Sequence, residues 1–293
     1  MELGFLNACL MDWPPEQVVD LAERKGFSVI ELHGGPRYKA AEWPSVAKGD
    51  KKAVSAIAGP LEAKGVGCSG IMFGNLPYLD PDPGRRAEAA QYLTMLVHAA
   101  RQLGVPVVST FAGRSLEHDL EGNIKLFAEV FAPLAEEAER AGVRLAFENC
   151  AMTQGFMPAT NIAYSPVIWA AMFDALPAPC LGLNLDPSHL QWMGADVVGA
   201  TEEFGSRVVH VQAKDAEVMP SRLARTTTLG EGWWRYRIPG YGQVPWAGFF
   251  SALRAAGYAG AVSIEHEDPV FTGSDEGVID GLDRAAAFLR PYL

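Results

Sequence analysis

Acidic residues stand at the ends of three short apolar runs in the second half of the sequence: Glu148, Asp186 and Glu265. If these runs are neighbouring parallel strands of a barrel, their carboxyl ends face one small volume, which is where barrel enzymes hold their active sites. Three carboxylates packed so closely repel one another unless a cation lies between them. The pattern therefore predicts a site for a divalent metal ion.

A fourth oxygen donor lies on the apolar run at 207–213. Side chains two residues apart on a strand share a face, so His210, Gln212 and Lys214 are expected to point inward together. Gln212 would offer a carboxamide oxygen near the acids, whereas His210 would lie deeper as a hydrogen-bonded interior histidine. The predicted metal ligands are thus Glu148, Asp186, Gln212 and Glu265. This all-oxygen set favours Mn²⁺ or Mg²⁺, with Zn²⁺ or Co²⁺ as alternatives.

Eight apolar runs alternate along the chain with segments patterned as helices, which is typical of α/β proteins. The runs lie at about 2–8, 28–33, 66–72, 106–111, 143–148, 181–186, 207–213 and 260–265. Pro14-Pro15 and Ser165-Pro166 are helix start signals. Several helical segments end in a glycine placed to cap them, namely Gly26, Gly65, Gly104, Gly142 and Gly257.

Eight strand-helix units predict an α/β fold with a single (β/α)₈ TIM barrel domain over residues 1–293. A long connection after the seventh strand is expected at about 216–242. The alternative fold is a doubly wound open sheet. That fold usually carries a GxGxxG loop after its first strand, and the sequence has none there.

The composition disfavours several classes of partner. The chain has 35 acidic and 24 basic residues and a formal net charge of −11, which disfavours binding to nucleic acid or to anionic membranes. No run approaches the roughly 18 consecutive apolar residues that a membrane span needs, and the first residues lack the basic start of a signal peptide. We therefore expect a cytoplasmic protein. The four cysteines stand singly and are expected to be buried small apolar residues.

The polar motifs near the predicted strand ends resemble those of the sugar isomerase/epimerase-like TIM barrels, the superfamily related to xylose isomerase and endonuclease IV. The motifs are Phe147-Glu148-Asn149, Leu185-Asp186-Pro187-Ser188-His189, His210-Val211-Gln212-Ala213-Lys214-Asp215, Pro239-Gly240-Tyr241-Gly242-Gln243, Gly257-Tyr258-Ala259-Gly260 and Ser263-Ile264-Glu265-His266-Glu267-Asp268.

This resemblance implies one metal ion held by a Glu, an Asp, a His and a Glu from strands five to eight. Glu148, Asp186 and Glu265 match that pattern. Gln212 stands where many members carry a histidine of an HxHxKD run. We expect Gln212 to ligate there through its oxygen, and the alternative is a metal held by three side chains and additional water.

Three residues are candidates for substrate binding. His189 lies three residues after Asp186, where the resemblance places a histidine that contacts substrate or orients a ligand. Lys214 and Arg237 could pair with substrate oxygens, or they could simply balance the charge of the acids.

Aromatic residues are concentrated in the connection at about 216–242, which holds Trp233, Trp234 and Tyr236. Long loops in compact domains are commonly lids or binding loops, and aromatic rings suit the apolar face of a sugar or an aryl group. Packing of these rings onto the barrel rim is the alternative. Further candidates for the pocket wall are Glu31, His33, Trp13 and Phe73.

The resemblance and the predicted metal site together favour a metal-dependent sugar isomerase or epimerase of carbohydrate metabolism. Glu148 and Glu265 would be catalytic, moving a proton next to a carbonyl through an enediolate while also contributing ligand oxygens. The alternative is a lyase of the same superfamily, either a keto-inositol dehydratase or an eliminase that cleaves oxidised 3-keto glycosides.

Two further classes fit less well. An endonuclease IV-like phosphodiesterase needs three zinc ions and several histidine ligands, but few of the six histidines lie at predicted strand ends. A sugar-binding protein without catalysis is the alternative if no metal binds. The expected partner is a small carbohydrate or glycoside, and the sequence leaves open a homo-oligomer or a partner subunit.

Overall fold

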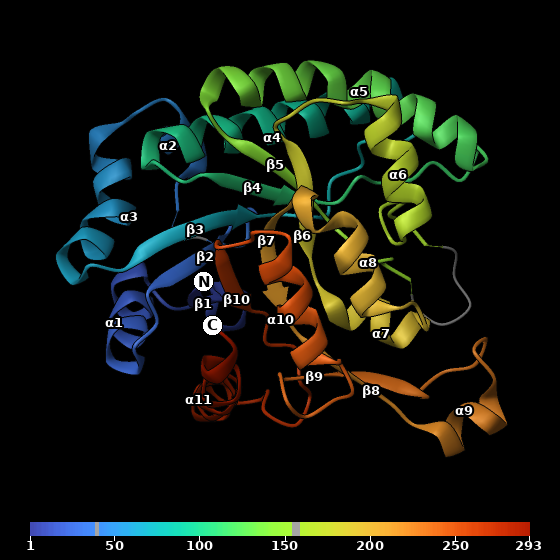
Figure 1. The fold of residues 1–293 in the computed structure, drawn as a ribbon. Coiled ribbons are helices and arrows are strands. Elements are labelled where there is room, and N and C mark those ends of the chain that lie inside the picture. Colours follow the sequence, from blue (N-terminus) through green and yellow to red (C-terminus); the bar gives the residue numbers. More distant parts are fainter. Residues whose placement is uncertain (39–40, 154–158) are drawn as a thin grey trace.

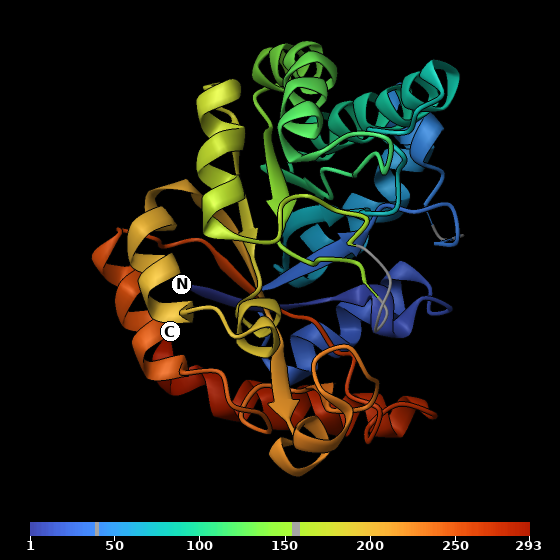
Figure 2. The same ribbon diagram turned by 90° about the vertical axis from the view of Figure 1, so that its right-hand side faces the viewer.

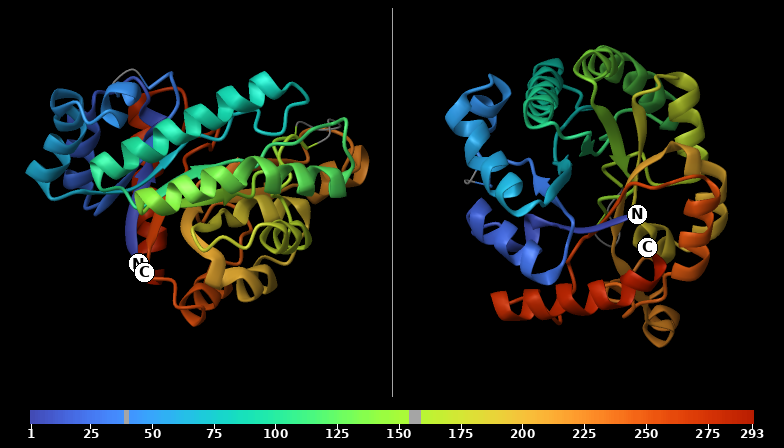
Figure 3. Two further views of the ribbon diagram at one scale, coloured as in Figure 1. Left: turned by 90° about the horizontal axis from the view of Figure 1, so that it is seen from above. Right: turned by 60° about the vertical axis from the view of Figure 1, so that its left-hand side comes forward.

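A computed structural model of the chain describes residues 1–38, 41–153 and 159–293. Eight parallel strands close into a barrel in the order β1-β10-β7-β6-β5-β4-β3-β2, and Figure 3 shows the helices arranged around them. The strands are β1 (Glu2–Leu6), β2 (Val29–His33), β3 (Gly67–Met72), β4 (Val107–Thr110), β5 (Arg144–Glu148), β6 (Leu181–Leu185), β7 (Val208–Ala213) and β10 (Ala261–Ile264). Each strand lies within the apolar run expected for it, so the predicted (β/α)₈ barrel is confirmed.

Helices fill the connections between the strands, with both chain ends near the same end of the barrel (Figure 1). They are α1 (Pro15–Lys25), α2 (Trp43–Ala47), α3 (Lys51–Lys64), α4 (Pro83–Leu103), α5 (Leu120–Ala141), α6 (Pro166–Ala175), α7 (Pro187–Met193), α8 (Val197–Phe204), α9 (Pro220–Thr226), α10 (Trp246–Ala255) and α11 (Asp275–Leu289). No helix in the described ranges is long and apolar enough to cross a membrane.

Glycine ends several of the helices, as the sequence predicts. Gly26 and Gly142 follow α1 and α5 with φ angles of 69° and 70°. This left-handed conformation satisfies the last helical carbonyls and strains any residue with a Cβ atom. Pro166 begins α6 after Ser165, as expected, although the Ser165 side chain makes no capping hydrogen bond.

The barrel interior changes from apolar to polar toward the carboxyl ends of its strands. Every residue of β6 is buried, as expected of a parallel sheet covered on both faces. Glu31, Asn184, His210 and Gln212 are at most 1% exposed within the barrel. The register of the strands therefore decides which of these buried polar groups meet.

The connection after β7 contains a two-stranded antiparallel sheet. Its strands are β8 (Asp215–Val218) and β9 (Trp234–Arg237), with α9 between them. This segment, orange in the figures, projects beyond the ring of helices (Figures 1 and 2). The sequence predicted a long connection here, and the structure gives it a hairpin of its own.

Candidate metal and active site

Two strand ends are joined directly by side-chain hydrogen bonds. Glu148 is the last residue of β5, and Asp186 follows β6. Asn149 Nδ2 donates to the Asp186 carbonyl oxygen (2.9 Å), and the Asp186 backbone N–H donates to Asn149 Oδ1 (2.8 Å). Asp186 also caps α7, because its Oδ1 accepts from the backbone N–H of Ser188 at 2.8 Å. Asp186 is therefore held in place through both its backbone and its carboxylate.

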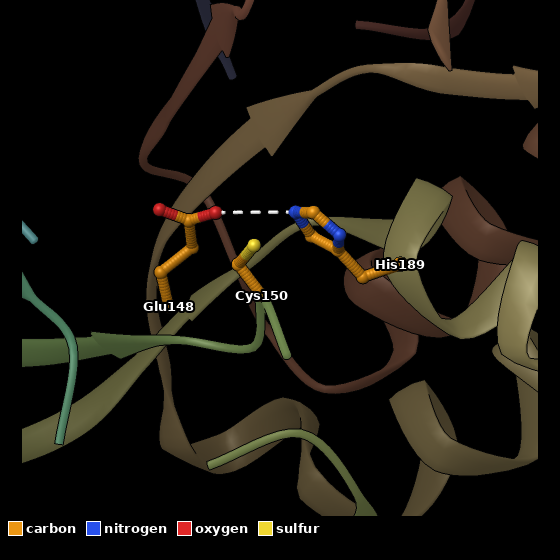
Figure 4. Close-up of side chains that lie close together, drawn as sticks. All are labelled: Glu148, Cys150 and His189. Atoms are coloured by element: carbon orange, nitrogen blue, oxygen red, sulfur yellow. Dashed lines mark hydrogen bonds and ion pairs between the residues drawn. The ribbon is translucent and has the colours of Figure 1, made fainter. Parts of the chain in front are cut away.

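His189 lies on the first turn of α7 and joins these acids. Its Nε2 is 3.2 Å from Glu148 Oε1 and 3.2 Å from Asp186 Oδ2, and its Nδ1 is 3.2 Å from the Tyr236 hydroxyl. Burial lowers the pKa of His189 to about 4, so the ring is neutral near pH 7. Carboxylate oxygens accept hydrogen bonds, so in the tautomer that suits these contacts Nε2 carries the proton and Nδ1 accepts from the Tyr236 hydroxyl. Figure 4 shows the Glu148–His189 contact with the Cys150 thiol beside it.

Lys214 brings a positive charge into the same volume. Its Nζ lies 2.6 Å from Glu265 Oε2 and 2.9 Å from Glu267 Oε2. It is also 3.3 Å from Asp186 Oδ2. Burial disfavours this charge, but the three carboxylates outweigh burial and raise the pKa of Lys214. Lys214 thus relieves part of the repulsion among the acids. This repulsion alone therefore does not require a bound cation, contrary to the expectation from the sequence.

Burial changes the acidity of the two candidate catalytic glutamates. It raises the pKa of Glu148 to about 7, against the opposing effect of Lys214. It also raises the pKa of Glu265, again against Lys214. At about 7, the Glu148 carboxyl group can hold or release a proton near neutral pH, which general acid–base catalysis requires. A cation bound between the two glutamates would favour their ionised forms.

The donor atoms in this cluster fit a divalent cation. One ligand atom from each of Glu148, Asp186, His189 and Glu265 lies within 4.8 Å of all the others. This group contains three of the four predicted ligands, together with a histidine predicted to bind substrate. Its donors are mainly carboxylate oxygens, which hard divalent cations prefer. The buried cluster could therefore hold a metal ion.

Gln212, the fourth predicted ligand, lies deeper in the barrel. In the sheet register Gln212 pairs with Ser263 of β10. Ser263 precedes Glu265 by two residues, so these two side chains point to the same side of the sheet. Gln212 Nε2 donates to Glu31 at 3.2 Å. Its Oε1 is buried and has no hydrogen-bond partner in the described part of the chain. An unpaired buried acceptor is costly, and a cation would satisfy it.

Arg237 belongs to a structural junction at the base of the hairpin. Its guanidinium contacts Glu217 at 2.8 Å and Asp268 at 2.8 Å. Asp215 anchors the following loop, because its carboxylate accepts from the backbone N–H groups of Gly240 and Val244. These contacts give Arg237 and the following 239–243 segment a structural role, because they hold the loop after β9 in place. Substrate binding by Arg237 stays a prediction.

The remaining sequence candidates lie in different surroundings. His210 is an interior residue, as expected, with Nδ1 3.0 Å from Asn184 Oδ1. His33 and Phe73 form an edge-on ring contact, whereas the Trp13 indole donates to Asp275 in an exposed position. All four cysteines are free; Cys150 and Cys180 are buried, and Cys9 and Cys68 are half-buried.

Aromatic residues of β9 reach the acid cluster. The Trp234 ring contacts the Tyr236 ring at 4.8 Å and stacks on Trp192 of α7 at 4.3 Å. A cavity of about 640 Å³ begins beside this stack, with Trp192, Trp233 and Tyr164 among its lining residues. The contact of Tyr236 with His189 was not predicted. Trp234 and Tyr236 are two residues apart, the spacing that places side chains on one face of a strand. This spacing is the sequence signal that could have indicated the contact.

A protein-family model described as "Xylose isomerase-like TIM barrel" matches residues 19–292. The chain belongs to this family. The carboxylate and histidine cluster at the carboxyl ends of β5, β6 and β10 thus lies where barrel enzymes place their active sites. Membership of the xylose isomerase-like TIM barrels agrees with the resemblance carried by the strand-end motifs.

Individual relatives match part of this xylose isomerase-like chain. The uncharacterised protein YfiH of Bacillus subtilis is 36% identical over 146 residues, which are 46% of this chain and 44% of YfiH. Inosose isomerase of Halalkalibacterium halodurans is 27% identical over 171 residues, which are 58% of this chain and 56% of that protein. The chain therefore spans about half the length of each of these relatives.

Solved structures match over nearly the whole chain. D-psicose 3-epimerase, determined in the presence of D-fructose, gives a TM-score of 0.76 at 16% identity and covers 100% of this chain and 99% of that one. The apo form of the Escherichia coli 3-keto-D-glucoside 4-epimerase YcjR gives 0.72 at 15% identity, with 98% and 99% covered. At these identities the likeness is one of fold.

Proposed function

We propose that this chain is a divalent-metal-dependent isomerase or epimerase of a carbohydrate. The observation that carries the proposal is the buried cluster in which Glu148 and Glu265, both with a pKa raised by burial, lie within 4.8 Å of Asp186 and His189. Two such carboxyl groups at one site can remove a proton from carbon on one side and return it on the other. The sugar epimerases and the inosose isomerase among the similar proteins support this class of reaction.

Glu148, Asp186, Gln212 and Glu265 would hold the cation in this proposal. When bound, a divalent cation supplies a positive charge that polarises a substrate carbonyl and stabilises the charge of the enediolate. The predominance of oxygen donors favours Mn²⁺ or Mg²⁺, with Zn²⁺ and Co²⁺ as alternatives. His189 is better suited to orienting Glu148, because its Nε2 proton faces the carboxylates and its Nδ1 faces Tyr236.

Substrate binding is assigned to the groups that border the cluster. Neutral His189 can donate to a sugar hydroxyl in place of one of its carboxylate partners. Lys214 is positively charged and contacts Glu265, so it can bind a substrate oxygen while keeping that acid in place. The proton itself is taken and returned by Glu148 and Glu265, whose carboxylates approach from different strands.

The second candidate is a lyase that cleaves oxidised 3-keto glycosides. A keto-inositol dehydratase is a lyase of the same kind with a smaller substrate. The cavity of about 640 Å³ favours the glycoside, because its aromatic lining offers room for a group attached to a sugar ring. The cavity borders the segments that carry the acid cluster. Its lining residues Ala151 and Gln191 stand one and two residues after Cys150 and His189 in the chain. One of the similar structures is also named for a glycoside, although as an epimerase of a 3-keto-D-glucoside.

Incubation with Mn²⁺ and two substrate panels separates these functions. Formation of an epimer from a free ketohexose supports the proposed reaction, and inertness toward ketohexoses with release of the aglycone from a 3-keto glycoside supports the lyase. The Glu148→Gln variant, purified in the same way, controls for contaminating epimerases. Absence of turnover on both panels by the Mn²⁺-loaded protein would contradict both candidates.

A further inference from the structure

Glu31 and Gln212 face each other inside the barrel. Glu31 lies on β2 and Gln212 on β7, and both are 0% exposed. These strands are not neighbours, because β1 and β10 stand between them in the sheet order. Gln212 Nε2 nevertheless lies 3.2 Å from Glu31 Oε2 and 3.4 Å from Oε1. The amide thus donates across the barrel to both carboxylate oxygens.

This contact decides which end of the Gln212 amide is left free. The oxygen and nitrogen ends of a carboxamide have nearly the same shape, so packing alone hardly distinguishes them. When ionised, the Glu31 carboxylate only accepts hydrogen bonds, so it attracts the NH₂ end and leaves the oxygen end turned away. Oε1 is that end, and it is among the buried side-chain atoms that have no hydrogen-bond partner in the described residues. Only the oxygen end can ligate a cation.

The neighbouring histidine has its own partners. His210 Nδ1 is 3.8 Å from Glu31 Oε1 but only 3.0 Å from Asn184 Oδ1, and its Nε2 is 3.1 Å from Ser69 Oγ. Because an amide oxygen accepts, the Nδ1 proton is directed at Asn184. Both ring nitrogens of His210 therefore have hydrogen-bond partners other than Glu31. The Glu31 carboxylate accepts from Gln212 instead.

We propose that Glu31 is a positioning residue for the metal site: it fixes the side-chain amide of Gln212 with its oxygen directed at the cation. In this way a buried carboxylate converts an ambiguous side chain into an oxygen ligand and gives the site its preference for hard cations. The inference rests on the proposed metal-dependent function. Glu31 contacts neither substrate nor cation in this assignment, and it acts through Gln212 alone.

A double-mutant cycle read by metal binding tests this assignment. Mn²⁺ and Zn²⁺ are titrated by calorimetry into the metal-free full chain carrying Glu31→Gln, Gln212→Ala, or both. Partners that orient a ligand are worth about 10- to 100-fold in metal affinity, so we expect Glu31→Gln to weaken Mn²⁺ binding by that factor. Zn²⁺ should lose less. In the Gln212→Ala background the Glu31 substitution should have no effect.

Matched variants separate positioning from general damage to the barrel interior. Ser69→Ala removes a hydrogen bond from His210 on the other side of the same network, and it should leave Mn²⁺ affinity unchanged. Glu31→Asp keeps the charge but withdraws it from Gln212, so it should repeat the loss if Glu31→Gln fails to fold. Thermal unfolding of each metal-free variant establishes that it is folded.

The outcomes distinguish this inference from the function on which it rests. Equal weakening by Glu31→Gln with and without Gln212 would overturn the positioning role and leave the metal-dependent function standing. Unchanged Mn²⁺ affinity in Glu31→Gln would do the same. A wild-type chain that binds no divalent cation would overturn both proposals.

Discussion

Replacing Lys214 by methionine tests how the acid cluster is neutralised. Lys214 Nζ lies 2.6 Å from Glu265 and 3.3 Å from Asp186, and its side chain is only 2% exposed. Methionine keeps much of the volume and removes the charge. Breaking a buried ion pair by removing one partner costs about 3–5 kcal/mol, because the other charge is left buried and unpaired. We expect a loss of that size in the free energy of unfolding of the metal-free protein at about pH 8.

The loss should depend on pH in a defined direction. Without Lys214 the pKa of Glu265 in the folded state rises further above its unfolded value, since burial already raises it. A group with a raised folded pKa stabilises the protein below its unfolded pKa, and that stability is lost as the pH rises through the folded pKa. The deficit of Lys214→Met should therefore be smaller near pH 5 than near pH 8. Part of it should remain at pH 5, because Lys214 lowers the pKa of its other partner, Glu267. Added Mn²⁺ should recover part of it.

Urea unfolding of metal-free and Mn²⁺-loaded protein at both pH values measures these effects. Lys25→Met is the matched control, because Lys25 forms an ion pair with Asp283 at 2.6 Å between side chains that are 32% and 43% exposed. An exposed pair of this kind contributes about 0–1 kcal/mol. The reasoning is refuted if Lys214→Met is as stable as wild type at pH 8, or if its deficit is the same at pH 5.

Three other predictions concern the catalytic and metal-binding residues. Glu148→Gln and Glu265→Gln should each lower kcat by a factor on the order of 10²–10⁴. The variant that lacks the abstracting base should not incorporate solvent deuterium into the substrate, and deuterium incorporation at the wild-type rate by both variants would exclude both residues as the base. Gln212→His should retain the metal but shift preference toward Co²⁺ or Zn²⁺, since imidazole is the softer donor, and competition titrations with unchanged preference would place Gln212 outside the ligand set. Chelation should abolish turnover, with Mn²⁺ restoring more activity than Zn²⁺, and turnover that survives chelation would defeat the metal assignment.

The sequence predicts the barrel well because the barrel depends on local patterns. Short apolar runs and the helix-ending glycines repeat along the chain, and each run contains one observed strand. Once the strands are placed, their ends are placed as well, so the closeness of Glu148 to Asp186 follows from the fold. These features require no knowledge of long-range side-chain contacts.

Contacts across the barrel and from the hairpin could not be predicted in this way. Glu31 meets Gln212 across the interior, which depends on strand register and barrel closure. Tyr236 reaches His189 only because β8 and β9 pair as a hairpin within the long connection. Lys214 was expected to be a substrate ligand or a charge-balancing residue, and its contacts with the acids show that it at least balances charge.

Deuterium exchange at carbon tests the central claim, metal-dependent proton transfer beside a carbonyl, most directly. Ketohexoses and 3-keto glycosides would be incubated with the protein in D₂O, with Mn²⁺ or with a chelator, and the carbon next to the carbonyl followed by NMR. We predict that deuterium enters this position with Mn²⁺ and not with the chelator, and that Glu148→Gln or Glu265→Gln suppresses it. Absence of exchange with Mn²⁺ across both panels, or equal exchange in the presence of the chelator, would contradict the account.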